Sequence, residues 1–134
     1  MVLLVEDNPM DAYMIENTLK STGLPLNIIT ATDSGEAMDV FKQFERSGQG
    51  LALIVLDWKL PSNSGEELLT YARQSKACGD VPILVASSSS SPSEIREMMK
   101  HGATAYFPKA SDYDEYSDLK RLVLKLLKVE RSTP

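Results

Sequence analysis

Short apolar runs alternate with helix-like segments along the whole chain, and this alternation restricts the fold more than any other feature. The runs occupy residues 2–5, 26–30, 51–56, 83–86 and 105–107. Between them, apolar residues recur at the i, i+3, i+4 spacing that is typical of amphipathic helices. Repeated strand–helix–strand units connect through right-handed crossovers, which place helices on both faces of a parallel sheet. The sequence therefore predicts a doubly wound α/β domain.

Five runs of this kind fit the flavodoxin-like version of the fold. We predict a five-stranded parallel sheet in the order 2-1-3-4-5, with helices on both faces. In that order the last strand lies at an edge of the sheet, where Pro108 is tolerated because it lacks an N–H group. Asp33 and Ser91 are each followed three residues later by glutamate, a pattern that predicts capped helix starts at both positions.

Composition narrows the class of protein further. The chain has 134 residues, and we expect a single domain over residues 1–134 with no output domain. Its net charge of -5 argues against a nucleic-acid surface, which usually needs a basic patch. No apolar stretch reaches the ~18 residues of a membrane span, and the single cysteine, Cys78, fits a reducing compartment. We expect a cytoplasmic protein that binds neither nucleic acid nor membranes.

Polar residues stand just past four of the apolar runs. Glu6 and Asp7 follow the first run, Asp57 the third and Ser87 the fourth, and Lys109 stands just beyond the fifth. In open parallel sheets, ligands bind outside the carboxyl ends of the strands. Clustered carboxylates repel one another unless a cation lies among them, and their hard oxygens suit Mg²⁺. Because a carboxylate can also form an aspartyl-phosphate, these residues predict a metal-assisted phosphoryl site.

Each of these residues has an ordinary explanation when it is taken alone. Asp57 is then a strand-end residue, Ser87 a loop hydroxyl that bonds its own backbone, and Tyr106 a packed aromatic of the edge strand. The coincidence of acids, hydroxyl and ammonium at strand ends favours the functional interpretation. We expect His101, the only histidine, to be a helix-end residue favoured by the helix dipole and not a metal ligand.

At these positions the sequence resembles the receiver domain of two-component response regulators, including chemotaxis-regulator-like receivers. The matching motifs occur in the family's order and at its spacing over essentially the whole chain: LLVEDNP at residues 3–9, LDWKLP at 56–61 with Gly65 following, PILVAS at 82–87 and GATAYFPK at 102–109. The segment EDNPMDA at residues 6–12 is also similar to a branch of stand-alone receivers that are associated with phytochrome-type kinases.

The resemblance implies a phosphoacceptor and a metal site. Asp57 matches the phosphoacceptor, which takes a phosphoryl group from a kinase phosphohistidine. Glu6 and Asp7 match the acidic pair that organises Mg²⁺ together with Asp57; Asp7 is expected to bind the ion directly and Glu6 through water. Lys59 occupies the position whose backbone carbonyl completes the metal shell.

The remaining matches imply a switch, and two positions depart from the family pattern. Ser87 matches the hydroxyl that moves to the phosphoryl oxygen, Tyr106 the aromatic coupled to that movement, and Lys109 the cation that pairs with the phosphoryl group. Ala110 stands where the family usually has proline, so we expect a trans peptide and a different loop path there. A serine run over residues 88–91 follows the switch hydroxyl.

The resemblance implies a stand-alone receiver that a histidine kinase or phosphotransfer protein phosphorylates. Its output would be phosphorylation-dependent binding to a downstream protein target, or a homodimer through the last two helices and the edge strand. It would not be an enzyme beyond self-catalysed phosphorylation and dephosphorylation. Two alternatives stay open: a degenerate receiver that binds partners without phosphorylation, and a small metal-dependent phosphohydrolase. The intact acidic site argues against the first, and the lack of a second acid two residues after Asp57 argues against the second.

Overall fold

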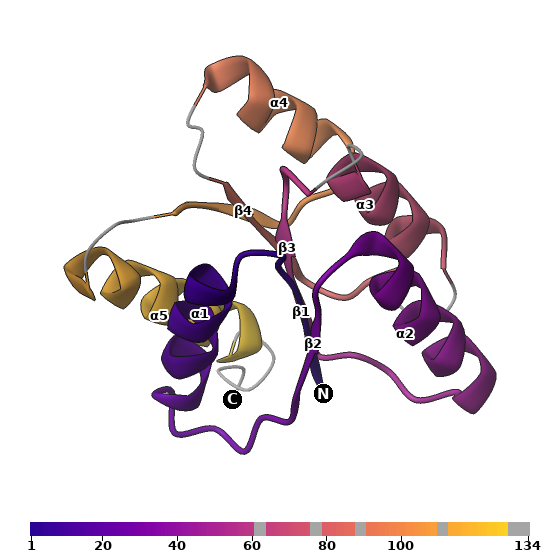
Figure 1. Ribbon diagram of the computed structural model, residues 1–134, viewed down its shortest axis with the longest axis horizontal. Coiled ribbons are helices and arrows are strands. Elements are labelled where there is room, and N and C mark those ends of the chain that lie inside the picture. The colour runs from indigo at the N-terminus through magenta and orange to yellow at the C-terminus, as the bar shows by residue number, and fades with distance from the viewer. Residues whose placement is uncertain (61–63, 76–78, 88–90, 110–112, 129–134) are drawn as a thin grey trace.

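The strands of the computed structural model form one parallel sheet with helices on both faces (Figure 1). The structure describes residues 1–60, 64–75, 79–87, 91–109 and 113–128. Its elements are, in chain order, β1 (Val2–Val5), α1 (Pro9–Lys20), β2 (Ile28–Ala31), α2 (Ser34–Ser47), β3 (Leu53–Asp57), α3 (Ser64–Gln74), β4 (Ile83–Ser87), α4 (Pro92–Lys100), β5 (Ala105–Pro108) and α5 (Tyr113–Lys128). Within these residues the strand order is β2-β1-β3-β4-β5, so the predicted flavodoxin-like topology is confirmed.

Two hydrophobic cores lie on opposite faces of the sheet, because successive strand residues point to opposite sides. On one face Leu4 and Val55 pack with α1 and α5. On the other face Leu3 and Ile54 pack with α2, α3 and Met98 of α4. Figure 1 shows α1 and α5 together on one side of the strands and α2 and α3 on the other. Full burial of each large aliphatic side chain contributes about 1.5–3 kcal/mol, so the central strands hold the carboxyl edge of the sheet in a fixed register.

Two helix starts are capped by side chains, and one predicted cap does not form. The Asn8 side chain accepts hydrogen bonds from two first-turn N–H groups of α1 at 2.9 and 3.1 Å. The cap predicted at Asp33 forms, with a first-turn N–H of α2 donating at 2.8 Å. The capping box predicted at Ser91 is wrong, because its side chain makes no cap hydrogen bond. Glu94, its expected partner, instead lies 3.5 Å from the Lys59 ammonium, an ion pair that links α4 to the loop after β3.

The connection from β3 to α3 requires glycine at position 65. A Cβ atom on Gly65 would lie 2.3 Å from the carbonyl oxygen of Trp58, far inside the distance at which real Cβ atoms meet other atoms. The backbone fixes the position of a Cβ atom, and the Trp58 carbonyl is itself backbone, so no side-chain rotation can relieve the contact. Gly65 therefore lets the first turn of α3 pack against the residue that follows Asp57.

At the amino edge of the sheet, the Arg73 side chain joins three segments of the chain. Its guanidinium donates hydrogen bonds to the carbonyl oxygens of Gly102 at 2.7 Å, Gly79 at 3.2 Å and Val81 at 2.6 Å, and to the Thr104 hydroxyl at 3.0 Å. These bonds link the end of α3 to the segments that enter β4 and β5. We call this set of four bonds the Arg73 staple.

Candidate functional site

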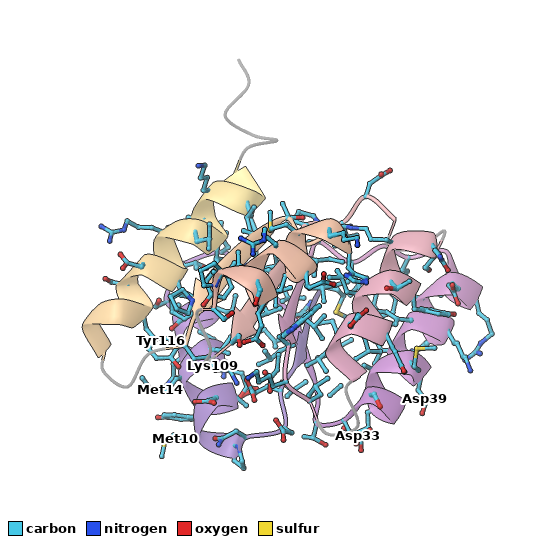
Figure 2. All side chains as sticks on the ribbon, turned by 90° about the horizontal axis from the view of Figure 1, so that it is seen from above. Met10, Met14, Asp33, Asp39, Lys109 and Tyr116 are labelled. Atoms are coloured by element: carbon cyan, nitrogen blue, oxygen red, sulfur yellow. The ribbon has the colours of Figure 1, made fainter. Side chains whose placement is uncertain are left out.

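The Lys109 side chain, which Figure 2 labels, lies at the centre of a carboxylate cluster at the carboxyl edge of the sheet. Its Nζ atom lies 2.8 Å from Glu6 Oε1, 3.2 Å from Asp11 Oδ2 and 3.3 Å from Asp57 Oδ1. The exposed fractions are 10% for Lys109, 1% for Glu6 and 5% for Asp57. The sequence placed these three residues at strand ends, and the structure brings them into contact.

The sheet register produces this arrangement. Strands β1 and β3 pair in parallel up to the residue before Glu6 and the residue before Asp57, so both carboxylates emerge at the same level. The Lys109 backbone N–H donates to the Ser87 carbonyl oxygen at 2.8 Å, which continues the β4–β5 ladder past the end of β5. The backbone therefore holds Lys109 beside the two acids.

Burial sets the electrostatics of the cluster. It raises the pKa of Glu6 from 4.5 to about 7, an effect that the hydrogen bond from Lys109 offsets only in part. Burial also raises the pKa of Asp57, against the opposing charge of Lys109. For Lys109 itself, burial acts to lower the pKa, but the contacts with Glu6 and Asp57 outweigh it and raise the pKa. The site thus holds more negative charge than this one ammonium neutralises.

The same cluster has the ligands of a divalent cation site. Glu6, Asp7 and Asp57 each offer a carboxylate oxygen, and these oxygens lie within 4.8 Å of one another. Asp7 is exposed whereas the other two are buried, so the group opens to solvent on one side. An all-oxygen, anionic ligand set with an excess of negative charge fits Mg²⁺. The Lys59 backbone N–H donates to Asp57 Oδ1 at 3.1 Å and orients that carboxylate, while the ligand role of the Lys59 carbonyl stays a prediction.

Ser87 lies beside this cluster, as predicted. It ends β4 and is fully buried, and the residue before it, Ala86, pairs with Asp57 in the sheet. Its role as a switch hydroxyl stays a prediction. Both departures from the family pattern, at Ala110 and over most of the serine run (residues 88–90), lie outside the described residues.

Tyr106 connects the edge strand with α4. Its half-buried side chain packs against the core on the α2, α3 and α4 face. Burial raises the pKa of its hydroxyl, and the Glu94 carboxylate of α4 raises it further. Because Glu94 also pairs with Lys59, the N-terminal end of α4 is linked electrostatically to both β5 and the loop after Asp57. Tyr106 therefore packs against the core beside α4, and its switch role stays a prediction.

Sequence reasoning missed two residues of the site. Asp11, from the first turn of α1, is the third carboxylate on Lys109. A signal was available, because a helix that starts at the edge of a site places its first-turn side chains near it. Tyr116 of α5 is 4% exposed, and its hydroxyl has no hydrogen-bond partner among the described residues. Burial raises the pKa of this hydroxyl, and the charge of Asp11 raises it further. No sequence signal marked Tyr116, since its position depends on how α5 packs.

A comparison with protein families decides the class of this chain. The family model of the response regulator receiver domain matches residues 2–119. The chain belongs to the response regulator receiver family. Receiver domains are signalling phosphoacceptors and not conventional enzymes, and the predicted family and fold are confirmed. In the part of this receiver that the structure describes, no helix combines the length and apolar character needed to cross a membrane.

Individual relatives agree with this assignment. The receiver is 29% identical to the probable methanogenesis regulatory protein FilR2 of Methanothrix harundinacea, over 91% of this chain and 77% of that protein. The phosphorylated cyanobacterial phytochrome response regulator RcpA superposes with a TM-score of 0.77 at 27% identity, covering 99% of this chain and 94% of that one. The Mn²⁺-bound response regulator Rcp1 superposes with a TM-score of 0.75 at 25% identity, covering 99% of this chain and 95% of that one. The chain spans as little as 62% of the length of other curated relatives.

Proposed function

We propose that this receiver domain takes a phosphoryl group onto Asp57 from the phosphohistidine of a histidine kinase or phosphotransfer protein, with Mg²⁺ bound beside it. The observation that carries the proposal is the position of the Lys109 ammonium, 3.3 Å from Asp57 and 2.8 Å from Glu6. With Asp7 nearby, one sheet edge then holds a carboxylate nucleophile, a fixed cation and ligands for a divalent ion.

In the proposed reaction an Asp57 carboxylate oxygen attacks the phosphorus atom of the donor. The P–N bond breaks in line, and its electron pair stays on the donor imidazole. The Lys59 N–H holds the attacking carboxylate in place, and the Lys109 ammonium pairs with an oxygen of the transferred group. Mg²⁺, bound by Asp7, Asp57 and the Lys59 carbonyl and reached by Glu6 through water, would supply the remaining positive charge.

The ligand chemistry and one relative support the choice of ion. The donor set consists of carboxylates, and burial raises the pKa values of its two buried members, Glu6 and Asp57, because it disfavours their charged forms. A hard divalent cation relieves that excess charge. The Rcp1 relative carries Mn²⁺, an ion that also favours oxygen ligands.

We further propose that the receiver signals through α4, β5 and α5 in the cytoplasm, as a stand-alone domain. The phosphoryl group would draw the Ser87 hydroxyl inward, and Tyr106 would enter the space that this movement frees. Two observations support this route: Ser87 is buried beside Asp57, and Tyr106 lies within the electrostatic reach of Glu94 on α4. The partner would be a downstream protein or a second copy of the chain.

The phosphoacceptor assignment is tested with acetyl phosphate and intact-protein mass spectrometry. Asp57→Asn should abolish labelling, and Asp7→Asn should weaken it severely because a metal ligand is lost. Asp39→Asn is the matched control, since Asp39 is exposed on α2 and lies away from Lys109 (Figure 2). Labelling should require Mg²⁺ in the wild type.

Three outcomes would overturn parts of the proposal. Stoichiometric labelling of the Asp57→Asn variant would reject the phosphoacceptor. A wild type that takes neither acetyl phosphate nor the phosphoryl mimic beryllofluoride would be a degenerate receiver. Many turnovers of phosphate release from simple phosphomonoesters would identify a phosphohydrolase.

A further inference from the structure

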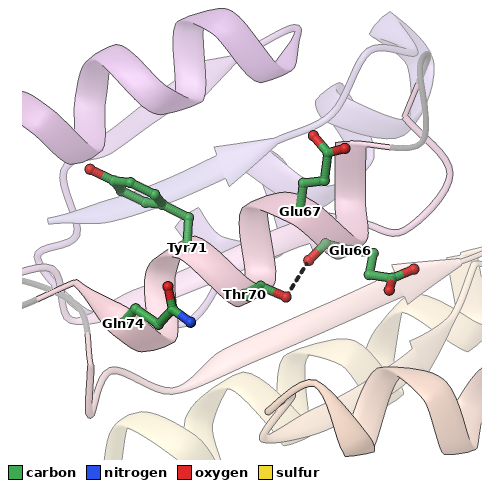
Figure 3. Close-up of a pocket in the computed structure, with 5 residues that line it drawn as sticks. All are labelled: Glu66, Glu67, Thr70, Tyr71 and Gln74. Atoms are coloured by element: carbon green, nitrogen blue, oxygen red, sulfur yellow. Dashed lines mark hydrogen bonds between the residues drawn. The ribbon is translucent and has the colours of Figure 1, made fainter.

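A second group of metal-binding side chains lies between α3 and the end of α4, apart from the Lys109 cluster. It consists of Glu66 from α3, Glu97 from α4 and His101, which caps α4. One donor atom from each lies within 4.8 Å of the other two. On α3, Glu66 and Glu67 border the same shallow pocket, but their carboxylates point in different directions (Figure 3). Glu66 is thus the member of this pair that reaches the α4 side.

The hydrogen bonds of His101 determine which of its ring nitrogens can bind a cation. Nδ1 lies 2.8 Å from the backbone carbonyl oxygen of Glu97, an atom that only accepts hydrogen bonds. Nδ1 must therefore carry hydrogen, and in a neutral ring Nε2 then presents a lone pair. That Nε2 atom lies 2.8 Å from Glu66 Oε1, another electron-rich atom. Nε2 and Glu66 Oε1 are therefore placed to bind one cation, whereas Glu97 Oε2 lies 3.8 Å from Nδ1, so the exposed Glu97 side chain has to turn toward Nε2 to bind the same ion.

The bond from Nδ1 to a carbonyl is the arrangement that orients histidines in metal sites. An outer hydrogen bond of this kind fixes the tautomer and the ring orientation, and leaves Nε2 for the metal. One imidazole and two carboxylates suit Zn²⁺ and neighbouring transition ions, whereas the all-carboxylate set at Asp57 suits Mg²⁺. We propose that Glu66, Glu97 and His101 form a zinc-class metal site that clamps the end of α4 to α3.

The clamp would act on the helix that is expected to signal. At its other end α4 is linked to Lys59 through Glu94 at 3.5 Å. The Trp58 ring lies 6.4 Å from the His101 ring, between centroids, and Trp58 directly follows Asp57. An ion at the clamp would therefore restrain α4 and reduce the change in partner affinity on phosphorylation. This regulatory consequence rests on the proposed function, but binding of the ion does not.

The binding test uses Zn²⁺ and isothermal titration calorimetry on chelator-treated protein. A Cys78→Ser background removes the single thiol, and excess Mg²⁺ occupies the acidic site. Protein with the wild-type residues at the clamp should bind one Zn²⁺. His101→Gln and Glu66→Gln should each weaken zinc binding by roughly tenfold or more, because loss of even an outer-shell partner weakens metal binding by about that factor. Glu67→Gln, which changes the neighbouring carboxylate, should bind like the wild type. Circular dichroism checks that every variant is folded.

A second readout separates the two sites. Trp58 is the only tryptophan of the chain, so quenching of its fluorescence by Ni²⁺ reports an ion held nearby. Quenching should persist in Asp57→Asn and disappear in His101→Gln. Zinc affinity that is equal in the wild type and His101→Gln would show that His101 binds no metal ion, and would overturn the proposal. Zinc binding lost in Asp57→Asn would place the ion in the acidic site and overturn it as well. Loss of phosphorylation alone would leave these binding results untouched and would reject only the proposed function.

Discussion

The ammonium of Lys109 lies 2.8 Å from Glu6, 3.2 Å from Asp11 and 3.3 Å from Asp57, so the shortest of its three ion pairs is not with the proposed phosphoacceptor. Glu6 holds the cation in the structure, and Asp57 shares it. The cation is thereby kept within reach of a phosphoryl group on Asp57 without a movement of the backbone.

Replacement of Lys109 should therefore destabilise the fold in a pH-dependent way. Lys109→Met leaves Glu6 and Asp57 buried without their cation, which should cost about 3–5 kcal/mol of unfolding free energy when both acids are ionised. The loss of unfolding free energy should be smaller at a pH one unit below the Glu6 pKa of about 7 than at a pH one unit above it, because protonated acids no longer need the cation. Urea titrations at both pH values measure this, with exposed Lys125→Met as the control. A loss that is equal at both would contradict the ion-pair account.

The metal-free receiver should lose stability as the pH rises toward neutrality. Glu6 has a raised pKa in the folded state, so its contribution to stability is fully present below 4.5 and is lost as the pH rises through about 7. Burial shifts Asp57 in the same direction. A rise of the Glu6 pKa from 4.5 to about 7 corresponds to an effect on the order of 3 kcal/mol.

Chemical denaturation across this pH range, with a chelator and with Mg²⁺, measures the effect. Glu6→Gln should flatten the pH dependence, because the amide does not titrate. Mg²⁺ should restore stability at the alkaline end, where the carboxylates are ionised and can bind it. Parallel pH profiles for the wild type and Glu6→Gln would show that Glu6 does not set the slope.

The proposed switch makes a separate prediction about coupling. Ser87→Ala and Tyr106→Ala should both leave Asp57 open to phosphorylation but reduce the effect of phosphorylation on partner binding. Allosteric coupling is typically ~1–3 kcal/mol, so beryllofluoride should change the wild-type affinity by about 5- to 150-fold. Affinity for a partner or for a second copy is measured with and without beryllofluoride, with exposed Tyr13→Ala as the control. If neither substitution changes the coupling, the switch uses other residues.

Gly65→Ala should disturb the loop that carries the site. Its new Cβ would meet the Trp58 carbonyl oxygen at 2.3 Å, so the start of α3 and the residue after Asp57 must move apart. Overpacking of this kind costs about 1–3 kcal/mol, and phosphorylation by acetyl phosphate should slow. Gly50→Ala is the matched control, since a Cβ atom at Gly50 would meet no heavy atom within 4 Å. Stability and labelling equal to those of Gly50→Ala would contradict the steric argument.

Residues at strand ends were predictable because a parallel sheet brings them to one edge. The apolar run before Asp57 fixed the end of β3, and the same reasoning placed Glu6 and Ser87. The apolar runs of the sequence predicted the first residues of the strands less accurately than the last residues. Leu51 is buried yet lies before β3 begins at Leu53, since an apolar side chain can enter the core from a loop.

Contacts made by helix side chains were not predictable in the same way. Asp11 meets Lys109, and His101 meets Glu66, only because the helices pack on the sheet with particular rotations. Periodicity gives the apolar face of a helix but not which charged side chain of a neighbouring helix lies opposite. Glu94 illustrates the point: the local capping pattern predicted a partner in its own helix, and the structure pairs it with Lys59.

The Arg73 staple has a consequence for the kinetics of the fold. Its guanidinium bonds Gly102 and Thr104, 29 and 31 residues farther along the chain, so we expect it to close late in folding, once these distant segments have come together. Interactions that form after the folding transition state slow unfolding without speeding folding. Arg73→Met should therefore raise the unfolding rate in stopped-flow experiments and leave the folding rate nearly unchanged; a slowed folding rate would place the staple in the nucleus. The Arg73 staple and the proposed switch residues thus lie at opposite ends of the same two strands, so a substitution at Arg73 should alter the lifetime of the folded state and leave the phosphoryl site intact.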